Sequence, residues 1–165
     1  MCYSAQILAD YRRYVRMFGA ELSIKEFVDL FWRRSNGAKV AIPKAMEAAF
    51  TNPARDDERR IRTLIDEFAG QQATRFEQEL FKQRKRLADA ERSLQTKTTK
   101  AALESKRIAG DKIEWALGKL ADLRRTELAD EDSRIFPGHY APVMVMENGR
   151  PRVLTHAHKR DLVEV

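Results

Sequence analysis

The sequence has few of the features that define several common protein classes. It contains one cysteine, Cys2, so no disulfide can form within the chain, which is compatible with a reducing compartment. It has no run of about 18 apolar residues, so no transmembrane helix is expected. Residues 1–13 lack the basic stretch and the following apolar stretch of a secretory signal. We therefore expect a soluble, cytoplasmic protein that does not bind a membrane.

Motifs for several kinds of chemistry are also missing. The chain has no glycine-rich phosphate loop, no paired cysteines with zinc spacing and no recognisable serine, histidine and aspartate set. Its histidines are His139, His156 and His158. On a strand, His156 and His158 would share one face as a candidate metal site, but no third ligand is evident, so exposed histidines on a C-terminal tail are the favoured interpretation. We expect no metal and no cofactor.

Charge is what the chain has in abundance. Charged residues make up 34% of the 165 residues and hydrophobic residues 43%, a balance that permits a core but favours long solvated helices. The net charge of +6 suits an anionic partner such as nucleic acid, and it fits a charged helical surface equally well.

Basic residues cluster in two places that could contact phosphates. One is the run Lys-Gln-Arg-Lys-Arg at residues 82–86, and the other consists of Arg12, Arg13 and Arg16. The acidic residues near the first run are Glu77, Glu79, Asp89 and Glu91. Because acids at helical spacing support a solvated surface, we interpret the run 82–86 as the exposed face of a helix.

The first third of the chain predicts helices. Residues 5–18 carry apolar side chains at three- and four-residue spacing, which predicts a helix. Ser23 and Glu26 have the spacing of a capping box, which predicts a second helix that ends near residue 36. A short third helix is predicted over residues 43–50, because proline suits the first helical position.

Residues 56–128 contain no proline, and their apolar residues recur at steps of three, four and seven. In the second half of this region the expected stripe consists of Leu103, Ile108, Ile113, Leu117, Leu120 and Leu123. A single helix of ~70 residues would be roughly 105 Å long and would need a partner to bury its stripe. Because threonines have poor helix propensity, we predict an antiparallel helical hairpin that turns near residues 95–101, with Gly110-Asp111 as the alternative turn.

The pattern changes after Asp130. Residues 135–138 have the composition of a loop, and residues 143–146 form a short apolar run with strand character. The Asn148-Gly149 pair predicts a tight turn to a returning strand at residues 152–154. Because an isolated two-stranded hairpin is only marginally stable in water, we interpret this segment as the start of a larger sheet. The predicted fold is α-rich, with N-terminal helices and a long helical hairpin followed by a short β-hairpin.

Cys2 is the most informative residue for function. Methionine aminopeptidases remove Met1 when the next residue is small, and the product would carry an α-amine and a thiol on Cys2. With reference pKa values of about 7.7–8.0 and 8.5, both groups are partly nucleophilic near neutral pH. The amine can attack an aldehyde to form a Schiff base, and the thiol can then close a five-membered thiazolidine ring. Taken alone, a cysteine at position 2 is more often incidental.

Two short motifs and the insertion between them resemble one family. The chain begins Met-Cys-Tyr-Ser-Ala-Gln, and residues 134–143 read Arg-Ile-Phe-Pro-Gly-His-Tyr-Ala-Pro-Val. Both are similar to segments of the SOS response-associated peptidase (SRAP) family, in a branch that begins Met-Cys-Tyr-Ser-Ala. That branch carries a long charged helical insertion, which residues 20–130 match. The resemblance covers about residues 1–150.

The resemblance implies a DNA-damage function. SRAP proteins recognise abasic sites in single-stranded DNA, cross-link to them through the N-terminal cysteine, and are thought to release their own initiating residue. Cys2 then carries over as the catalytic residue, and Ala141 and Pro142 carry over as part of the DNA-binding wall beside it. The implied organisation is a nucleophile segment with the first helix at 1–19, a helical region with the hairpin insertion at 20–130, and a β segment with a tail of an incomplete α+β SRAP-like domain at 131–165.

The chain also departs from the family pattern. The family's Asn-Ala-Arg triplet is absent, and Asn52-Pro53-Ala54-Arg55 mimics it in the wrong region. The later glutamate and the later acid/base histidine motif are absent as well. We interpret the chain as a truncated or frame-shifted product that keeps the nucleophile. The alternative is a non-enzymatic coiled-coil interaction protein that self-associates through its helical hairpin.

Overall fold

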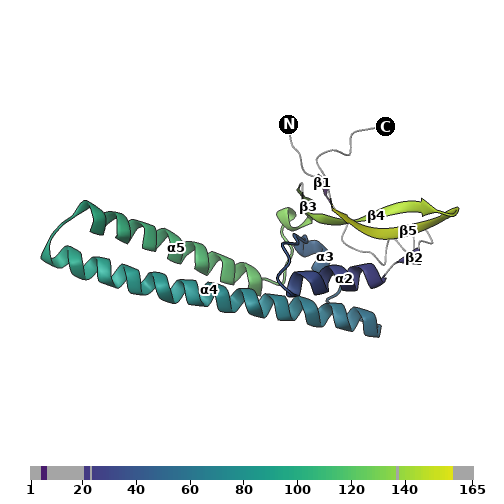
Figure 1. Cartoon of the computed structure of the whole chain (residues 1–165), viewed down its shortest axis with the longest axis horizontal. Coiled ribbons are helices and arrows are strands. Elements are labelled where there is room, and N and C mark those ends of the chain that lie inside the picture. The colour runs from purple at the N-terminus through teal and green to yellow at the C-terminus, as the bar shows by residue number, and fades with distance from the viewer. Residues whose placement is uncertain (1–4, 7–20, 23, 137, 158–165) are drawn as a thin grey trace. The chain divides into compact units, whose positions relative to one another are not determined.

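The computed structural model describes residues 5–6, 21–22, 24–136 and 138–157 (Figure 1). They belong to two compact units. Unit 1 comprises residues 1–68 and 127–165, and unit 2 comprises residues 69–126. The chain is rich in helix, with a long helical hairpin that precedes a β-hairpin, as the sequence predicted. No helix in the described part is long and apolar enough to cross a membrane.

The core of unit 1 lies where α2 (Ile24–Ser35), α3 (Lys44–Ala48) and the first turns of α4 (Asp56–Thr96) meet. Its buried members are Phe27, Leu30, Phe31, Met46, Phe50, Ile61, Leu64 and Ile65. The Phe50 ring lies at its centre, with ring centroids 6.0 Å from Phe27 and 5.7 Å from Phe31. Both predicted short helices are therefore confirmed, and they exist because their apolar faces converge on one aromatic cluster.

The ends of these helices follow from local chemistry. Gly37 adopts a φ of +88° after α2, a left-handed conformation that glycine reaches without a Cβ penalty. Its amide donates to the Arg34 carbonyl at 3.1 Å, which satisfies one terminal acceptor of the helix. Pro43 precedes α3 as its N-cap residue, with extended backbone, so the helix begins one residue later than predicted.

The hairpin of unit 2 pairs the later part of α4 with α5 (Lys100–Arg124). The turn falls at residues 97–99, as predicted, and the Thr99 hydroxyl caps α5 by accepting from the Ala102 amide at 3.1 Å. The alternative turn at Gly110-Asp111 is wrong, because both residues lie inside α5.

The buried seam of α5 differs from the predicted stripe. Its buried residues are Ala102, Ala109, Ala116 and Leu120. Leu103 and Leu117 were expected on the stripe, but they are 50% and 45% exposed. Alanines at a helix–helix contact let two helices approach closely, so α5 turns its alanine face, rather than these leucines, toward α4.

The β segment consists of β4 (Tyr140–Glu147) and β5 (Arg150–Ala157), which pair in antiparallel fashion. Asn148 and Gly149 have φ values of 51° and 77°, as a type I′ turn requires, so the predicted hairpin turn is confirmed. A third strand, β2 (Glu21–Leu22), pairs with β5 in parallel. The sheet order is β2-β5-β4, and this third strand had no signal in the sequence because two residues carry no periodicity.

A second small sheet joins the two ends of unit 1 in sequence. Strand β1 (Ala5–Gln6) pairs with β3 (Arg134–Ile135) in antiparallel fashion. The helix predicted over residues 5–18 is therefore wrong at residues 5 and 6, and its remainder lies outside the described residues. The loop predicted to begin at Ile135 is also wrong there. In both cases a tertiary pairing outweighs local propensity, which is a weak determinant of structure.

Candidate functional site

The predicted nucleophile, Cys2, lies outside the described residues, as do the arginines of the second basic patch, Arg12, Arg13 and Arg16. The nearest described residues are Ala5 and Gln6 of β1. Ala5 pairs with Ile135, and Gln6 pairs with Arg134, whose side chain is exposed. The β1–β3 pairing therefore places Ala5 and Gln6 beside the segment that carries the second family-like motif.

That segment is anchored to the helical part of unit 1. The Tyr140 amide donates to the Ala41 carbonyl at 2.9 Å, and the His139 amide donates to the Phe136 carbonyl at the same distance. The rings of Phe136 and His139 meet edge to face, with centroids 5.4 Å apart. These contacts hold the backbone of residues 136–140 in one path between β3 and β4.

Ala141 and Pro142 follow directly, in β4. Ala141 is 5% exposed and pairs with His156, while Pro142 pairs with Thr155. Ala141 therefore contributes to a packed wall rather than to an exposed contact surface. His156 belongs to the sheet and not to a tail, which corrects the interpretation from sequence, and His158 lies outside the described residues. Within the described ranges, no group of His, Cys, Asp and Glu is arranged to hold a metal.

A shallow groove of about 410 Å³ opens between α2 and the start of β4 in unit 1. Tyr140 and Leu30 line it together with Lys25, Arg33, Glu26 and Asp29. Two cations and two carboxylates give its wall no net charge. The groove therefore has no electrostatic preference for an anionic ligand.

One buried charge of unit 1, Arg34, has a structural role. Arg34 is 4% exposed and pairs with Glu47, so it joins α2 to α3. Its guanidinium also lies over the Phe68 ring of α4, 4.2 Å from the centroid. Sequence patterns did not indicate this residue, because its position on a helix face looked like that of any solvated arginine.

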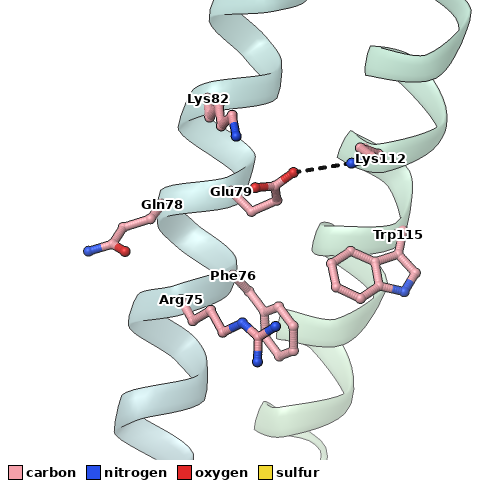
Figure 2. Close-up of a pocket in the computed structure, with 7 residues that line it drawn as sticks. All are labelled: Arg75, Phe76, Gln78, Glu79, Lys82, Lys112 and Trp115. Atoms are coloured by element: carbon pink, nitrogen blue, oxygen red, sulfur yellow. Dashed lines mark ion pairs between the residues drawn. The ribbon is translucent and has the colours of Figure 1, made fainter.

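Unit 2 contains a larger groove, of about 670 Å³, along one flank of the hairpin (Figure 2). Helix α4 contributes Arg75, Phe76, Glu79 and Lys82 to its wall, and α5 contributes Lys112 and Trp115. Phe76 and Trp115 meet edge to face, with centroids 5.3 Å apart and ring planes at 84°. Trp115 remains 50% exposed, so an aromatic surface is accessible at the groove.

Glu79 is the one carboxylate in this wall, and it is held ionised. The Gln83 amide donates to it at 2.7 Å, and Lys112 lies 3.8 Å away across the hairpin. The hydrogen bond from Gln83, followed by the charges of Lys82 and Lys112, lowers the pKa of Glu79. Glu79 therefore neutralises Lys112, while Arg75 and Lys82 have no ion pair among the described residues.

Lys82, Arg84 and Lys85 are exposed on α4, so the interpretation of the run 82–86 as an exposed helix face is confirmed for them, while the acids near the run form ion pairs with other residues. Glu77 contacts Arg124 at 3.9 Å, Asp89 contacts Arg92 at 3.1 Å and Glu91 contacts Lys106 at 3.1 Å. Cross-hairpin and local partners thus take up these carboxylates. Within the described residues, the run's Lys82, Arg84 and Lys85 are left without an ion pair.

The excess positive charge of the chain resides in unit 2. Residues 69–126 contain 14 Lys and Arg against eight Asp and Glu, a net charge of +6. The whole chain has 31 Lys and Arg and 25 Asp and Glu, so the residues outside unit 2 include 17 of each sign and have no net charge. The basic character of the protein is therefore a property of the helical hairpin.

Comparisons with known protein families, with curated proteins and with solved structures found no match to this chain. Two features of the chain itself bear on its function. One is the chemistry that Cys2 would have at an N-terminus, and the other is the basic and aromatic groove of unit 2.

Proposed function

We propose that the protein captures abasic sites in single-stranded DNA through Cys2 after removal of Met1. The open form of an abasic sugar carries an aldehyde. The Cys2 amine adds to this carbon and water leaves, which gives an imine. The Cys2 sulfur then adds to the imine carbon and its proton passes to the nitrogen, which closes a thiazolidine. The product is a covalent DNA–protein cross-link through two bonds to one carbon.

The single observation that supports this proposal is the pairing of β1 with β3. Three peptide units separate Cys2 from Ala5, and a chain of that length spans at most about 11 Å. Since Ala5 pairs with Ile135, the described chain begins beside β3, three residues after Cys2 in sequence. Arg134 of β3 is exposed and can contact a DNA phosphate beside the captured sugar.

The test is a cross-linking assay with a labelled oligonucleotide that contains one abasic site, analysed on a denaturing gel. We expect a heat-stable adduct with the parent protein and none with an oligonucleotide that carries a reduced, aldehyde-free site. Cys2→Ser is the matched control, because it keeps the amine but lacks the sulfur that closes the ring. It should give an adduct only when borohydride traps the imine. Equal heat-stable adduct from Cys2→Ser would contradict the proposal.

A second candidate function is a non-enzymatic interaction protein that self-associates through the hairpin. The exposed apolar side chains of unit 2 favour it, in particular Phe81 at 75% and Leu117 at 45% exposure. In that case Cys2→Ser would have no effect, whereas Leu117→Glu would convert an oligomer to a monomer in sedimentation experiments. A monomeric parent protein would remove this candidate.

A further inference from the structure

The groove of unit 2 combines two features that single-stranded nucleic acids require of a binding surface. One is an accessible aromatic ring, since every base has a π-face that can stack on it. The other is a row of cations that can follow the phosphates. Trp115 supplies the first, and Arg75 and Lys82 supply the second (Figure 2).

We propose that the α4–α5 groove binds single-stranded nucleic acid reversibly, with a base stacked on Trp115 and flanking phosphates at Arg75 and Lys82. This site does not depend on Cys2, so it goes beyond the capture of abasic sites. The charge and the shape of the site together indicate the class of ligand. A basic unit attracts a polyanion, and the half-exposed indole of Trp115 beside a groove of about 670 Å³ favours a polyanion with unpaired bases.

The aromatic pair and the spacing of the cations set the geometry of the groove. The Phe76 and Trp115 planes stand at 84°, so the two rings meet edge to face and support each other's orientation. Arg75 and Lys82 are seven residues apart on α4, which places them about 10.5 Å apart along the helix axis. They can therefore reach phosphates on either side of a nucleotide that is stacked between them.

The ion pairs around the groove explain why its cations are available. Glu79 is engaged by Gln83 and Lys112, and Glu77 is engaged by Arg124. No other carboxylate lines this groove. A bound strand would therefore neutralise Arg75 and Lys82 without breaking an ion pair of the described residues, although the charge of Lys82 also acts on Glu79.

Tryptophan fluorescence gives the most direct test. The chain has two tryptophans, so Trp32→Phe leaves Trp115 as the sole reporter. Titration with dT20, which contains no abasic site, should quench Trp115 as the base stacks. A duplex of the same length, whose base faces are covered, should bind without this quenching. An unchanged Trp115 signal at saturating dT20 would overturn the proposal, as would equal quenching by polyglutamate, which would indicate a general anion surface.

Substitutions of Trp115 test the stacking contact by fluorescence anisotropy with labelled dT20. Trp115→Leu should weaken binding about tenfold, which corresponds to about 1.4 kcal/mol. Trp115→Phe keeps a stacking ring and should retain most of the affinity, which guards against a folding defect. Trp32→Leu is the matched control, because Trp32 is similarly exposed but lies in unit 1. Equal affinities for Trp115→Leu and Trp32→Leu would refute the stacking role.

The phosphate contacts predict a change in salt dependence. Arg75→Gln combined with Lys82→Gln should reduce the slope of log K against log salt by about 1.4, at roughly 0.7 per lost contact to a single strand. Lys97→Gln with Lys100→Gln makes the same charge change at the hairpin turn and should leave the slope unaltered. If both double variants reduced this slope equally, the groove would be no more than part of a general basic surface, and the proposal would be overturned. Because Cys2→Ser should not alter dT20 binding, this outcome and the cross-linking outcome are independent.

Discussion

Phe50→Ala should strongly destabilise unit 1. Phe50 is 1% exposed and lies between the rings of Phe27 and Phe31. Removal of its ring loses the transfer free energy and leaves a cavity, which costs about 3–5 kcal/mol for a buried phenylalanine. That is a large fraction of the 5–15 kcal/mol that typically stabilises a domain.

The assay is urea unfolding in a Trp115→Phe background, so that Trp32 of α2 reports on unit 1. With an m-value of about 2 kcal/mol/M, a loss of about 4 kcal/mol lowers the midpoint by about 2 M. Phe136→Ala is the matched control, because Phe136 is in the same unit but 45% exposed. It should shift the midpoint by about 0.5 M or less. If the two variants unfold at the same urea concentration, the aromatic cluster is not the core of this unit.

Three further predictions concern charge, backbone and pH. Glu47→Ala should lower the free energy of unfolding by about 3 kcal/mol, because it leaves the buried Arg34 without its carboxylate. The double variant Arg34→Met with Glu47→Leu should recover most of that loss. An equal loss of stability in the single and the double variant would contradict this. Asn148→Val should destabilise the β-hairpin by about 1–2 kcal/mol, because a β-branched residue resists a φ of 51°, and Asn148→Gly should not. Glu79 has a pKa below its ordinary 4.5 in the folded protein. Its contribution to folding stability is therefore present above the unfolded pKa and is lost as the pH falls through the lowered value. An NMR titration should show a higher Glu79 pKa in Gln83→Leu, and an unchanged value would contradict the assigned cause.

The helical hairpin was predictable from the sequence because its determinants are local. Apolar spacing over residues 56–128 indicates amphipathic helices, and the threonine-rich stretch interrupts them where the turn forms. The Asn148-Gly149 turn was predictable for the same reason, since two residues specify its backbone. The periodicity did not predict which face of α5 packs against α4. Leucine spacing favoured Leu103 and Leu117, but close packing of two helices favours the alanines beside them.

The strands at the N-terminal end were not predictable, because each is two residues long and is defined by a distant partner. Ala5 pairs with Ile135 and Glu21 pairs with Arg152, at sequence separations that no local pattern encodes. The groove in unit 2 was missed for a related reason. Glu77, Glu79 and Glu91 lie close to the basic run in sequence, but their partners are on the opposite helix. Only the pairing of the helices shows which cations remain available.

The most direct test of the Cys2 chemistry is intact mass spectrometry of the purified protein, before and after incubation with an abasic oligonucleotide. Before incubation, the mass should be that of the chain without Met1. Afterwards it should increase by the mass of the oligonucleotide less one water, with fragmentation that locates the adduct on Cys2. Retention of Met1, or an adduct located on a lysine of the hairpin instead, would contradict the proposed mechanism.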